Sequence, residues 1–152
     1  MTPSERMARQ GLVLPSPAPA VGSYVQAKVH GDLVFVTGQL AFINGVITHP
    51  GVIGREITAA QGVAAASAAT LNSVAAAAAA VGGVDALSGV VQAVGYFACT
   101  DDFSELSMVM NAVSDTLGKV FGGAAAHTRS TVGVYTLPLN SAVEIQVTFA
   151  LE

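Results

Sequence analysis

The sequence predicts an α+β fold of two layers, with strands and helices in the order β-β-β-α-β-α-β-β. Three observations support this class: short segments of alternating polarity, two long segments with helix start and stop signals, and no internal repeat or linker. A chain of 152 residues can bury a sizeable core as one domain. We therefore expect a single domain over residues 1–152, in which residues 1–20 form an N-terminal arm.

The first third of the chain predicts mostly extended structure. Residues 1–13 can form a short turn of helix, whereas the three alternating prolines of residues 14–20 remove backbone donors and indicate an extended surface arm. A tight turn at Gly31-Asp32 joins the first two strands into a hairpin, and a turn at Asn44-Gly45 precedes a third strand. These strands are expected at residues 24–30, 33–39 and 46–49.

Residues 57–81 and 103–121 predict the two helices, and a glycine pair directly after each segment ends it. Thr58 is expected to cap the first helix, with a glutamine three residues later that completes a capping box. A strand over residues 90–100 lies between the helices. The adjacent carboxylates Asp101-Asp102 are expected to cap the second helix rather than to bind a metal.

Residues 127–152 predict a β-hairpin in which Arg129 and Glu144 are isolated charges among apolar or small residues. Only 11% of the chain is charged, and an unpaired buried charge is costly, so such residues are usually paired, exposed or functional. If the two strands pair, both side chains can face a common polar space. Spacing alone favours a structural salt bridge, or two solvated residues, over a functional site. Two helices cover only one sheet face, so we expect the Arg129 face to be partly shared with a neighbouring subunit.

Charge and composition argue against nucleic acid and membranes as partners. The net charge is −4 and the six basic residues are scattered, so no basic patch for nucleic acid is visible. The N-terminus lacks the apolar core of a signal peptide, and the most apolar run, residues 74–81, is too short to span a bilayer. These features predict a cytoplasmic protein.

No motif in the sequence indicates a metal or a cofactor. Glycine-rich phosphate loops and the GxSxG nucleophile motif are absent. His30, His49 and His127 have no metal-ligand spacing. The single cysteine, Cys99, excludes an intramolecular disulfide and is interpreted as a small buried hydrophobic residue rather than a nucleophile. We therefore expect neither a metal nor a cofactor.

Six short segments of the chain, each weak alone, gain weight from their order and spacing. They are Gly22-Ser23-Tyr24-Val25-Gln26, Phe35-Val36-Thr37-Gly38-Gln39, Asn111, Arg129-Ser130-Thr131-Val132, Leu137-Pro138 and Val143-Glu144-Ile145. Together they resemble the reactive intermediate deaminase (Rid, YjgF-like) family, once described as endoribonuclease L-PSP or translation initiation inhibitors. The resemblance runs from about residue 15 to the end. The arm and residues 46–55 resemble a divergent branch of that family most closely.

The resemblance implies a chorismate-mutase-like fold, a homotrimer and clefts between its subunits. It also implies hydrolysis of 2-imino acids, or their enamine tautomers, to 2-keto acids and ammonia. In this interpretation Arg129 binds the carboxylate of the substrate and Glu144 activates water. Tyr24 and Asn111 are further substrate-binding residues that the resemblance implies.

Two positions depart from the family pattern, and both leave the substrate range open. Thr37, a predicted substrate-binding residue, stands where the family often has serine. Thr131, a predicted catalytic residue, stands where the family often has cysteine and could orient the imine nitrogen. Arg129 would serve equally well in a non-catalytic trimer that binds a small carboxylate, so this alternative stays open. The net charge disfavours the older label of RNA cleavage.

Overall fold

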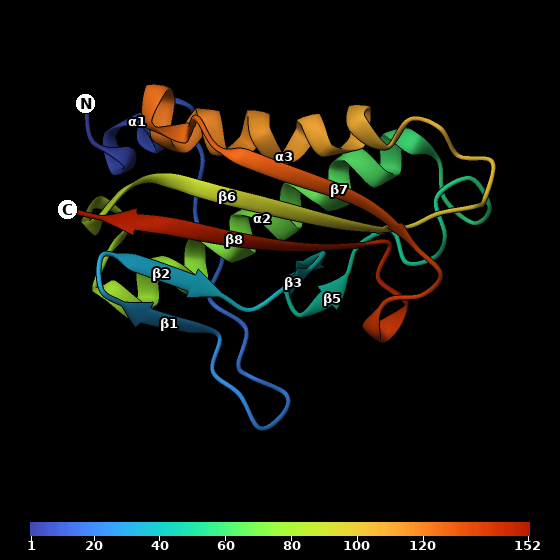
Figure 1. The fold of residues 1–152 in the computed structure, drawn as a ribbon, viewed down its shortest axis with the longest axis horizontal. Coiled ribbons are helices and arrows are strands. Elements are labelled where there is room, and N and C mark those ends of the chain that lie inside the picture. Colours follow the sequence, from blue (N-terminus) through green and yellow to red (C-terminus); the bar gives the residue numbers. More distant parts are fainter.

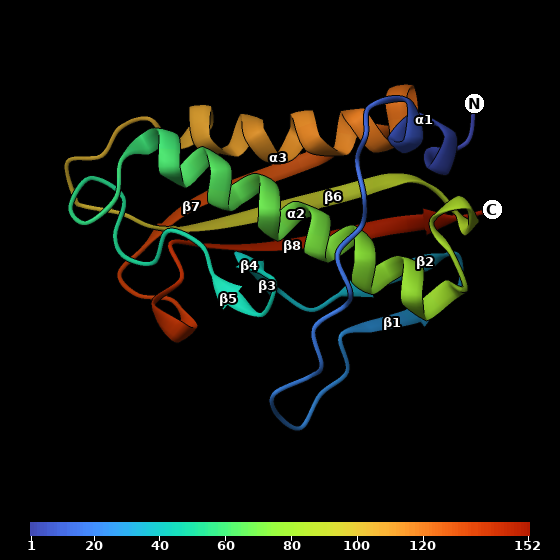
Figure 2. The same ribbon diagram turned by 180° about the vertical axis from the view of Figure 1, so that it is seen from behind.

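A mixed sheet forms one layer of the fold, and two long helices form the other layer on a single face of that sheet (Figures 1 and 2). The computed structural model describes residues 1–152. The α+β class and the two-layer arrangement are confirmed. The elements are α1 (Pro3–Arg9), β1 (Ala27–His30), β2 (Leu33–Val36), β3 (Gln39–Leu40), β4 (Phe42–Ile43), β5 (Val46–Ile47), α2 (Ala59–Val81), η1 (Val84–Ala86), β6 (Leu87–Ala98), α3 (Leu106–Phe121), η2 (Gly122–Ala125), β7 (Thr128–Val134), η3 (Pro138–Asn140) and β8 (Val143–Leu151).

The strand order of the main sheet is β1-β2-β8-β6-β7, with the short strand β3 also paired to β8. Strands β6 and β7 are parallel and are joined through α3 as a β-α-β unit, whereas the other pairs are antiparallel. The strand predicted at residues 46–49 does not join this sheet. It is β5, which pairs only with β4 in a separate two-stranded sheet.

The predicted hairpin over residues 127–152 is wrong. Strand β6 lies between β7 and β8, so the last two strands are not hydrogen-bonded neighbours (Figure 1). Residues 135–142, which include η3, carry the chain past the end of β6, and a connection of this length exceeds the two to five residues of an ordinary hairpin loop. The partner of β7 is set instead by the crossover through α3.

The helix signals in the sequence are confirmed at α2 and partly at α3. The Thr58 side chain accepts from the Gln61 backbone and the Gln61 side chain from the Thr58 backbone, and Gly82 ends α2 in the left-handed conformation. Helix α3 begins at Leu106 rather than at residue 103. Asp101-Asp102 lie in a turn, and the residue at the N-cap position is Glu105, without a side-chain hydrogen bond. The expected Asp101-Asp102 cap is therefore wrong.

Helix α2 lies close on the sheet because its inner face is built from small residues. Ala65, Ala69 and Ser73 are fully buried, and the Ser73 hydroxyl donates to the Ile145 carbonyl of β8 at 3.2 Å. By length and composition alone α2 could cross a membrane, but 61% of its most apolar stretch is buried inside this fold. This burial is typical of the core helix of a globular domain.

The N-terminal arm crosses the outer side of α2 as an extended segment (Figure 2). Leu14 and Pro17 line a shallow hollow there with Ala78 of the helix. The opposite face of the sheet carries no helix, and it exposes Phe35 by 45% and Val132 by 39%. One face of the sheet is therefore left uncovered by this chain, as expected for two helices. The expectation that this face carries Arg129 is wrong, because Arg129 is in register with the buried Ala93 on the helix side.

Candidate functional site

The predicted site residues form two groups that lie apart in one chain. The arginine cluster comprises Arg129 and Thr131 on β7, Asn111 and Ser114 on α3, and His127 before β7. The glutamate cluster comprises Glu144 on β8 with Tyr24, Thr37 and Gly38 from the loops around β1 and β2. Because β1 and β7 are the two opposite edges of the sheet, the loop before β1 and the edge strand β7 do not meet within the chain.

Arg129 lies on the helix side of the edge strand β7. It is in register with Ala93 of β6, which is fully buried beneath the helices, and residues in register share a face. Its Nη1 donates a hydrogen bond to the Ser114 hydroxyl of α3 at 3.0 Å. The side chain is exposed and forms no ion pair. The guanidinium is thus tethered at one donor and keeps its positive charge uncompensated.

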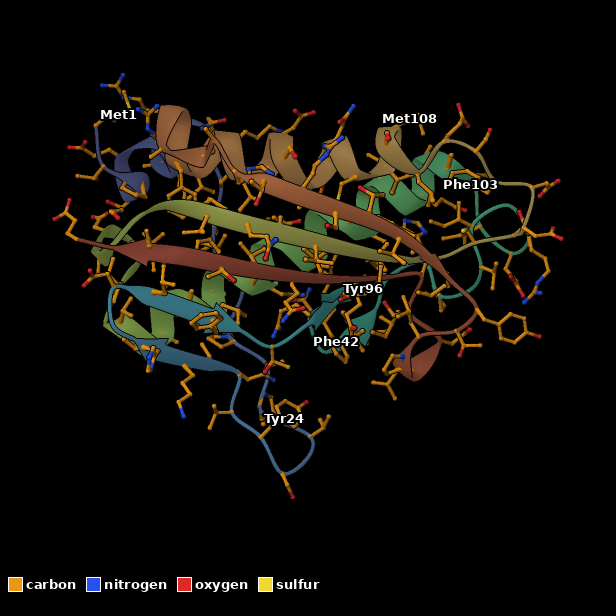
Figure 3. The ribbon with its side chains drawn as sticks, viewed as in Figure 1. Met1, Tyr24, Phe42, Tyr96, Phe103 and Met108 are labelled. Carbon is orange, nitrogen blue, oxygen red and sulfur yellow. The ribbon has the colours of Figure 1, made fainter.

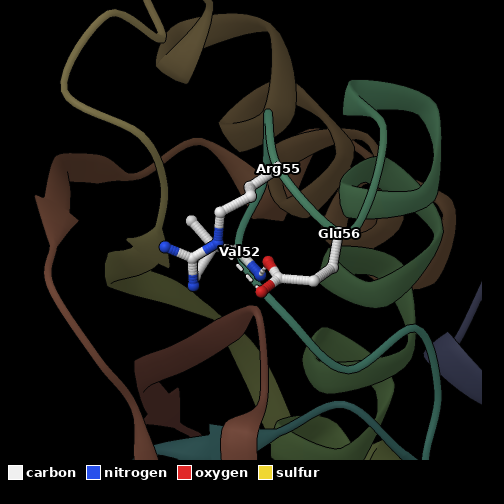
Figure 4. Close-up of polar contacts among 3 residues, drawn as sticks. All are labelled: Val52, Arg55 and Glu56. Carbon is white, nitrogen blue, oxygen red and sulfur yellow. Dashed lines mark hydrogen bonds and ion pairs between the residues drawn. The ribbon is translucent and has the colours of Figure 1, made fainter.

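Arg129 and Glu144 neither form the salt bridge that spacing alone allowed nor face a common polar space, because the two side chains leave opposite faces of the sheet. The sole ion pair of the structure joins Arg55 Nε to Glu56 Oε1 at 2.9 Å, and Glu56 also accepts from the Val52 backbone (Figure 4). These bonds hold the pKa of the Glu56 carboxyl below its usual range, the Val52 hydrogen bond most strongly.

Thr131 and Asn111 lie beside Arg129 on the same edge. Thr131 is two residues further along β7, so its side chain shares the helix side with Arg129. Asn111 precedes Ser114 by three residues on α3 and therefore lies on the same helix face, where it is exposed. These three predicted residues therefore lie on the same edge of the molecule, where β7 packs beside α3.

Glu144 projects from the uncovered face of the sheet. It is in register with Tyr96 of β6 and Leu40 of β3, and its side chain is partly buried. No hydrogen bond or ion pair reaches its carboxylate, and partial burial raises the pKa of the Glu144 carboxyl above its usual value. An unpaired carboxylate with a raised pKa is suited to accept a proton from water.

Gly38 makes room for the Glu144 side chain. A Cβ atom at this position would lie 2.8 Å from Cδ of Glu144 and 3.1 Å from its Oε2. The backbone here is held from behind by Asn72 of α2, whose Nδ2 donates to the carbonyls of Leu40 and Phe42 at 3.0 Å. The glycine therefore fixes where the carboxylate can lie.

We expect Gly38→Ala to reduce activity while the fold remains intact. The added methyl group must displace the carboxylate of Glu144, a side chain that can swing away without disturbing the core. Circular dichroism and thermal unfolding should stay close to those of the parent chain. The catalytic rate that depends on the Glu144 carboxylate should fall about as far as when Glu144 itself is replaced by glutamine, roughly 100-fold or more. Full activity in Gly38→Ala would show that this carboxylate position does not matter.

Thr37, in the loop after β2, is hydrogen-bonded to the separate loop before β1 that contains Tyr24. The Thr37 hydroxyl donates to the Val25 carbonyl at 2.7 Å, and its backbone N–H donates to the Gln26 carbonyl at 2.8 Å. Tyr24 is 43% exposed in the loop that projects from the molecule beyond β1 (Figure 3). Its hydroxyl accepts a hydrogen bond from the Val21 backbone at 3.3 Å. The Thr37 hydroxyl thus serves first to hold the Tyr24 loop.

A prominent cleft in the chain contains none of the predicted site residues. Its volume is about 660 Å³, and it lies at the ends of β6 and β7 between the loops that contain Arg55, Asp101 and Tyr135. Cys99 lines it, and burial raises the pKa of that thiol, which disfavours the reactive thiolate. No group of three or more side chains suited to a metal forms anywhere in the structure. The chemistry-bearing residues therefore lie outside the cleft that one chain forms by itself.

Comparison with known sequences places the chain in a family. The sequence profile described as "YjgF/chorismate_mutase-like, putative endoribonuclease" matches residues 4–151, so the chain belongs to the YjgF family. Protein TCP17 of Trypanosoma cruzi is 34% identical over 142 residues, which cover 91% of this chain and 88% of that protein.

Two solved structures share the fold over nearly the whole chain. The protein Atu1372 of Agrobacterium tumefaciens, of unknown function, has a TM-score of 0.88 at 30% identity, and the match covers 99% of this chain and 92% of that one. A putative endoribonuclease from Shewanella oneidensis MR-1 has a TM-score of 0.95 at 28% identity, and the match covers 99% of this chain and 100% of that one. The sequence-based assignment to the YjgF-like family is confirmed.

Sequence reasoning missed three residues of these clusters: Gly38 beside the carboxylate, and Ser114 and His127 beside the guanidinium. Gly38 was part of a matching segment, but its closeness to Glu144 depends on the pairing of β3 with β8. Ser114 follows Asn111 by three residues, a helical spacing that points to a shared face. The contact of His127 with Ser114 spans the end of α3 and had no sequence signal.

Proposed function

We propose that the protein hydrolyses 2-imino acids, or their enamine tautomers, to 2-keto acids and ammonia. The observation that supports this most is the exposed Arg129, held by a neutral hydroxyl and free of any carboxylate partner. A guanidinium binds a carboxylate through two parallel hydrogen bonds, which fixes the substrate's orientation as well as its position. Membership in the YjgF family is consistent with this activity.

We further propose that the site forms between chains of a homotrimer. The Tyr24 loop extends beyond the β1 edge, and the arginine cluster lies at the opposite β7 edge. A head-to-tail contact brings the glutamate cluster of one chain to the arginine cluster of the next, and such contacts close into rings. The uncovered sheet face with Phe35 and Val132 gives each subunit apolar surface to bury in this ring.

In the proposed reaction, Arg129 holds the carboxylate and the electrophilic C=N carbon faces the neighbouring chain. Glu144 of that chain takes a proton from water as the oxygen adds to this carbon, and the proton passes on to the nitrogen. Collapse of the resulting carbinolamine releases ammonia and leaves the 2-keto acid. Thr131 and Asn111 supply polar groups beside the leaving nitrogen, and Tyr24 covers the substrate. Proximity converts the attack into an effectively intramolecular step.

The activity is tested by generating 2-iminobutyrate or 2-aminoacrylate in the cuvette and following its disappearance. Purified protein should accelerate the loss over buffer and over heat-inactivated protein, with one ammonia released per keto acid formed. Rates equal to those in buffer across several imino acids would contradict the proposal. We place the reaction in the cytoplasm, where the solitary Cys99 stays reduced.

We expect a mass of about 46 kDa in solution, three times the chain mass of 15.2 kDa. Native mass spectrometry gives this value directly.

Chains of Tyr24→Ala and Arg129→Ala, each impaired alone, should regain activity when refolded together. Random mixing leaves both residues intact at about a quarter of the interfaces, if each site takes one residue from each of two chains. A monomer, or no recovery in mixed trimers, would contradict a shared site.

A trimer that binds a small carboxylate without turnover is the second candidate, because Arg129 suits that role equally. Glu144 separates the two, since a base is needed only for hydrolysis. RNA cleavage, which the family description names, finds no support in this chain's net charge of −4. We therefore do not assign it.

A further inference from the structure

We propose that Ser114 and His127 are positioning residues that aim the Arg129 guanidinium at its ligand. The proposal rests on the proposed function, in which Arg129 anchors the substrate carboxylate. It concerns a chain of three hydrogen bonds that runs from Arg129 to Ser114, from Ser114 to His127, and from His127 to the backbone. Neither Ser114 nor His127 belongs to the segments by which the sequence resembles its family.

The direction of each hydrogen bond follows from one unambiguous partner. The His127 Nδ1 atom bonds the Ala125 carbonyl, which can only accept, so Nδ1 carries the proton. In the neutral ring Nε2 is then an acceptor, and the Ser114 hydroxyl 3.1 Å away donates to it. The Ser114 oxygen keeps its lone pairs free for Arg129 Nη1, which donates to it at 3.0 Å.

The chain of bonds fixes Arg129 without neutralising it. An acidic partner would occupy the fork of the guanidinium and cancel the charge that a ligand carboxylate needs. Ser114 instead takes one of the five donors of the guanidinium and leaves four for a ligand. Preorganising the guanidinium in this way lowers the entropy lost when the carboxylate binds.

His127 has a separate part in this arrangement, because a serine hydroxyl rotates freely unless something holds it. With Nε2 as its acceptor, the Ser114 hydroxyl hydrogen points away from Arg129 and cannot turn toward it. The ring itself is partly buried and tied to the Ala125 carbonyl at the end of η2, directly before β7. The middle of α3, through Ser114, and the residue just before β7, His127, are thereby linked to the rotamer of one arginine.

The test compares Ser114→Ala, His127→Ala, His127→Gln and Arg129→Ala by the dissociation constant for 2-oxobutyrate and by the kinetics of imine hydrolysis. Loss of one hydrogen bond predicts a roughly 3- to 10-fold weaker affinity and an equal rise in KM, with kcat nearly unchanged. The double variant Ser114→Ala/His127→Ala should be no weaker than Ser114→Ala, because both residues act through one chain of bonds. His127→Gln restores an acceptor at the Nε2 position and should recover most of the affinity.

A second readout is independent of any ligand. Nitrogen-15 NMR in mildly alkaline buffer should show the His127 ring as the Nδ1–H tautomer, assigned by the signal that disappears in His127→Gln. The Nε2–H tautomer would overturn the inferred direction of the bonds and the proposal with it.

The outcomes separate this inference from the proposed function. Weak binding in Arg129→Ala, together with full affinity in both Ser114→Ala and His127→Ala, would overturn the inference and leave the function standing. Full affinity and full activity in Arg129→Ala would overturn both. Equal thermal unfolding of the variants and the parent chain shows that the changes act on the site.

Discussion

Replacing Arg129 with alanine is expected to lower kcat/KM for imino acid hydrolysis by about 100-fold or more. Two charge-assisted hydrogen bonds to the substrate carboxylate are lost, each worth roughly 1.5–3 kcal/mol. The protein fold should be unaffected, because the side chain is exposed and its single hydrogen bond goes to the Ser114 hydroxyl. Steady-state kinetics with in situ generated 2-iminobutyrate gives the value directly.

Two controls define what the loss means. Arg129→Lys keeps the charge but not the two-pronged geometry, so it should recover only part of the activity. Arg55→Ala removes an arginine that is already paired with Glu56, and it should leave the rate unchanged. If Arg129→Ala and Arg55→Ala behaved alike, the guanidinium on β7 would have no specific role.

Replacing Glu144 with glutamine is expected to lower kcat by about 100- to 10,000-fold while carboxylate binding is retained. The amide has nearly the same shape as the carboxylate but cannot accept a proton from water. Gln146→Ala, two residues further on the same face of β8, is the matched control and should retain the rate. Unchanged turnover in Glu144→Gln would indicate that another group is the base. No turnover in either the parent chain or Glu144→Gln would favour a protein that only binds the carboxylate.

The pH dependence gives Glu144 a second signature. The group acts as a carboxylate, so activity should rise as the pH increases through its pKa. Because burial raises the pKa of Glu144, this acid limb should lie at a higher pH than for an ordinary glutamate. A profile of kcat/KM against pH should show the limb in the parent chain and lose it in Glu144→Gln. An acid limb of the same midpoint in both would assign it to another group.

The sequence predicted local structure well where the signal was local. The capping box at Thr58, the left-handed Gly82 and the proline-rich arm each depend on neighbouring residues, and all three are confirmed. The sequence predicts too early a start for α3. Two adjacent aspartates are typical of a helix N-terminus in composition, but Asp101 and Asp102 form a separate turn before the helix begins at Leu106.

Long-range pairing could not be predicted in the same way. Alternation along β7 and β8 correctly separates the faces of each strand, but it does not say which strands are neighbours. The parallel partner of β7 is β6, and that register places Arg129 beside Ala93 on the helix side, away from Glu144. The residues proposed for the site are consequently split between two clusters that one chain does not unite.

In the proposed trimer, Arg129 of one chain holds a carboxylate in a cleft that the next chain completes. A crystal structure with 2-oxobutyrate bound tests it most directly. We predict that the carboxylate lies against both terminal nitrogens of Arg129 at a subunit interface, with Ser114 still bonded and Tyr24 of the neighbouring chain over the ligand. A ligand bound within one chain, in the cleft beside Cys99, with Arg129 unoccupied, would contradict the account.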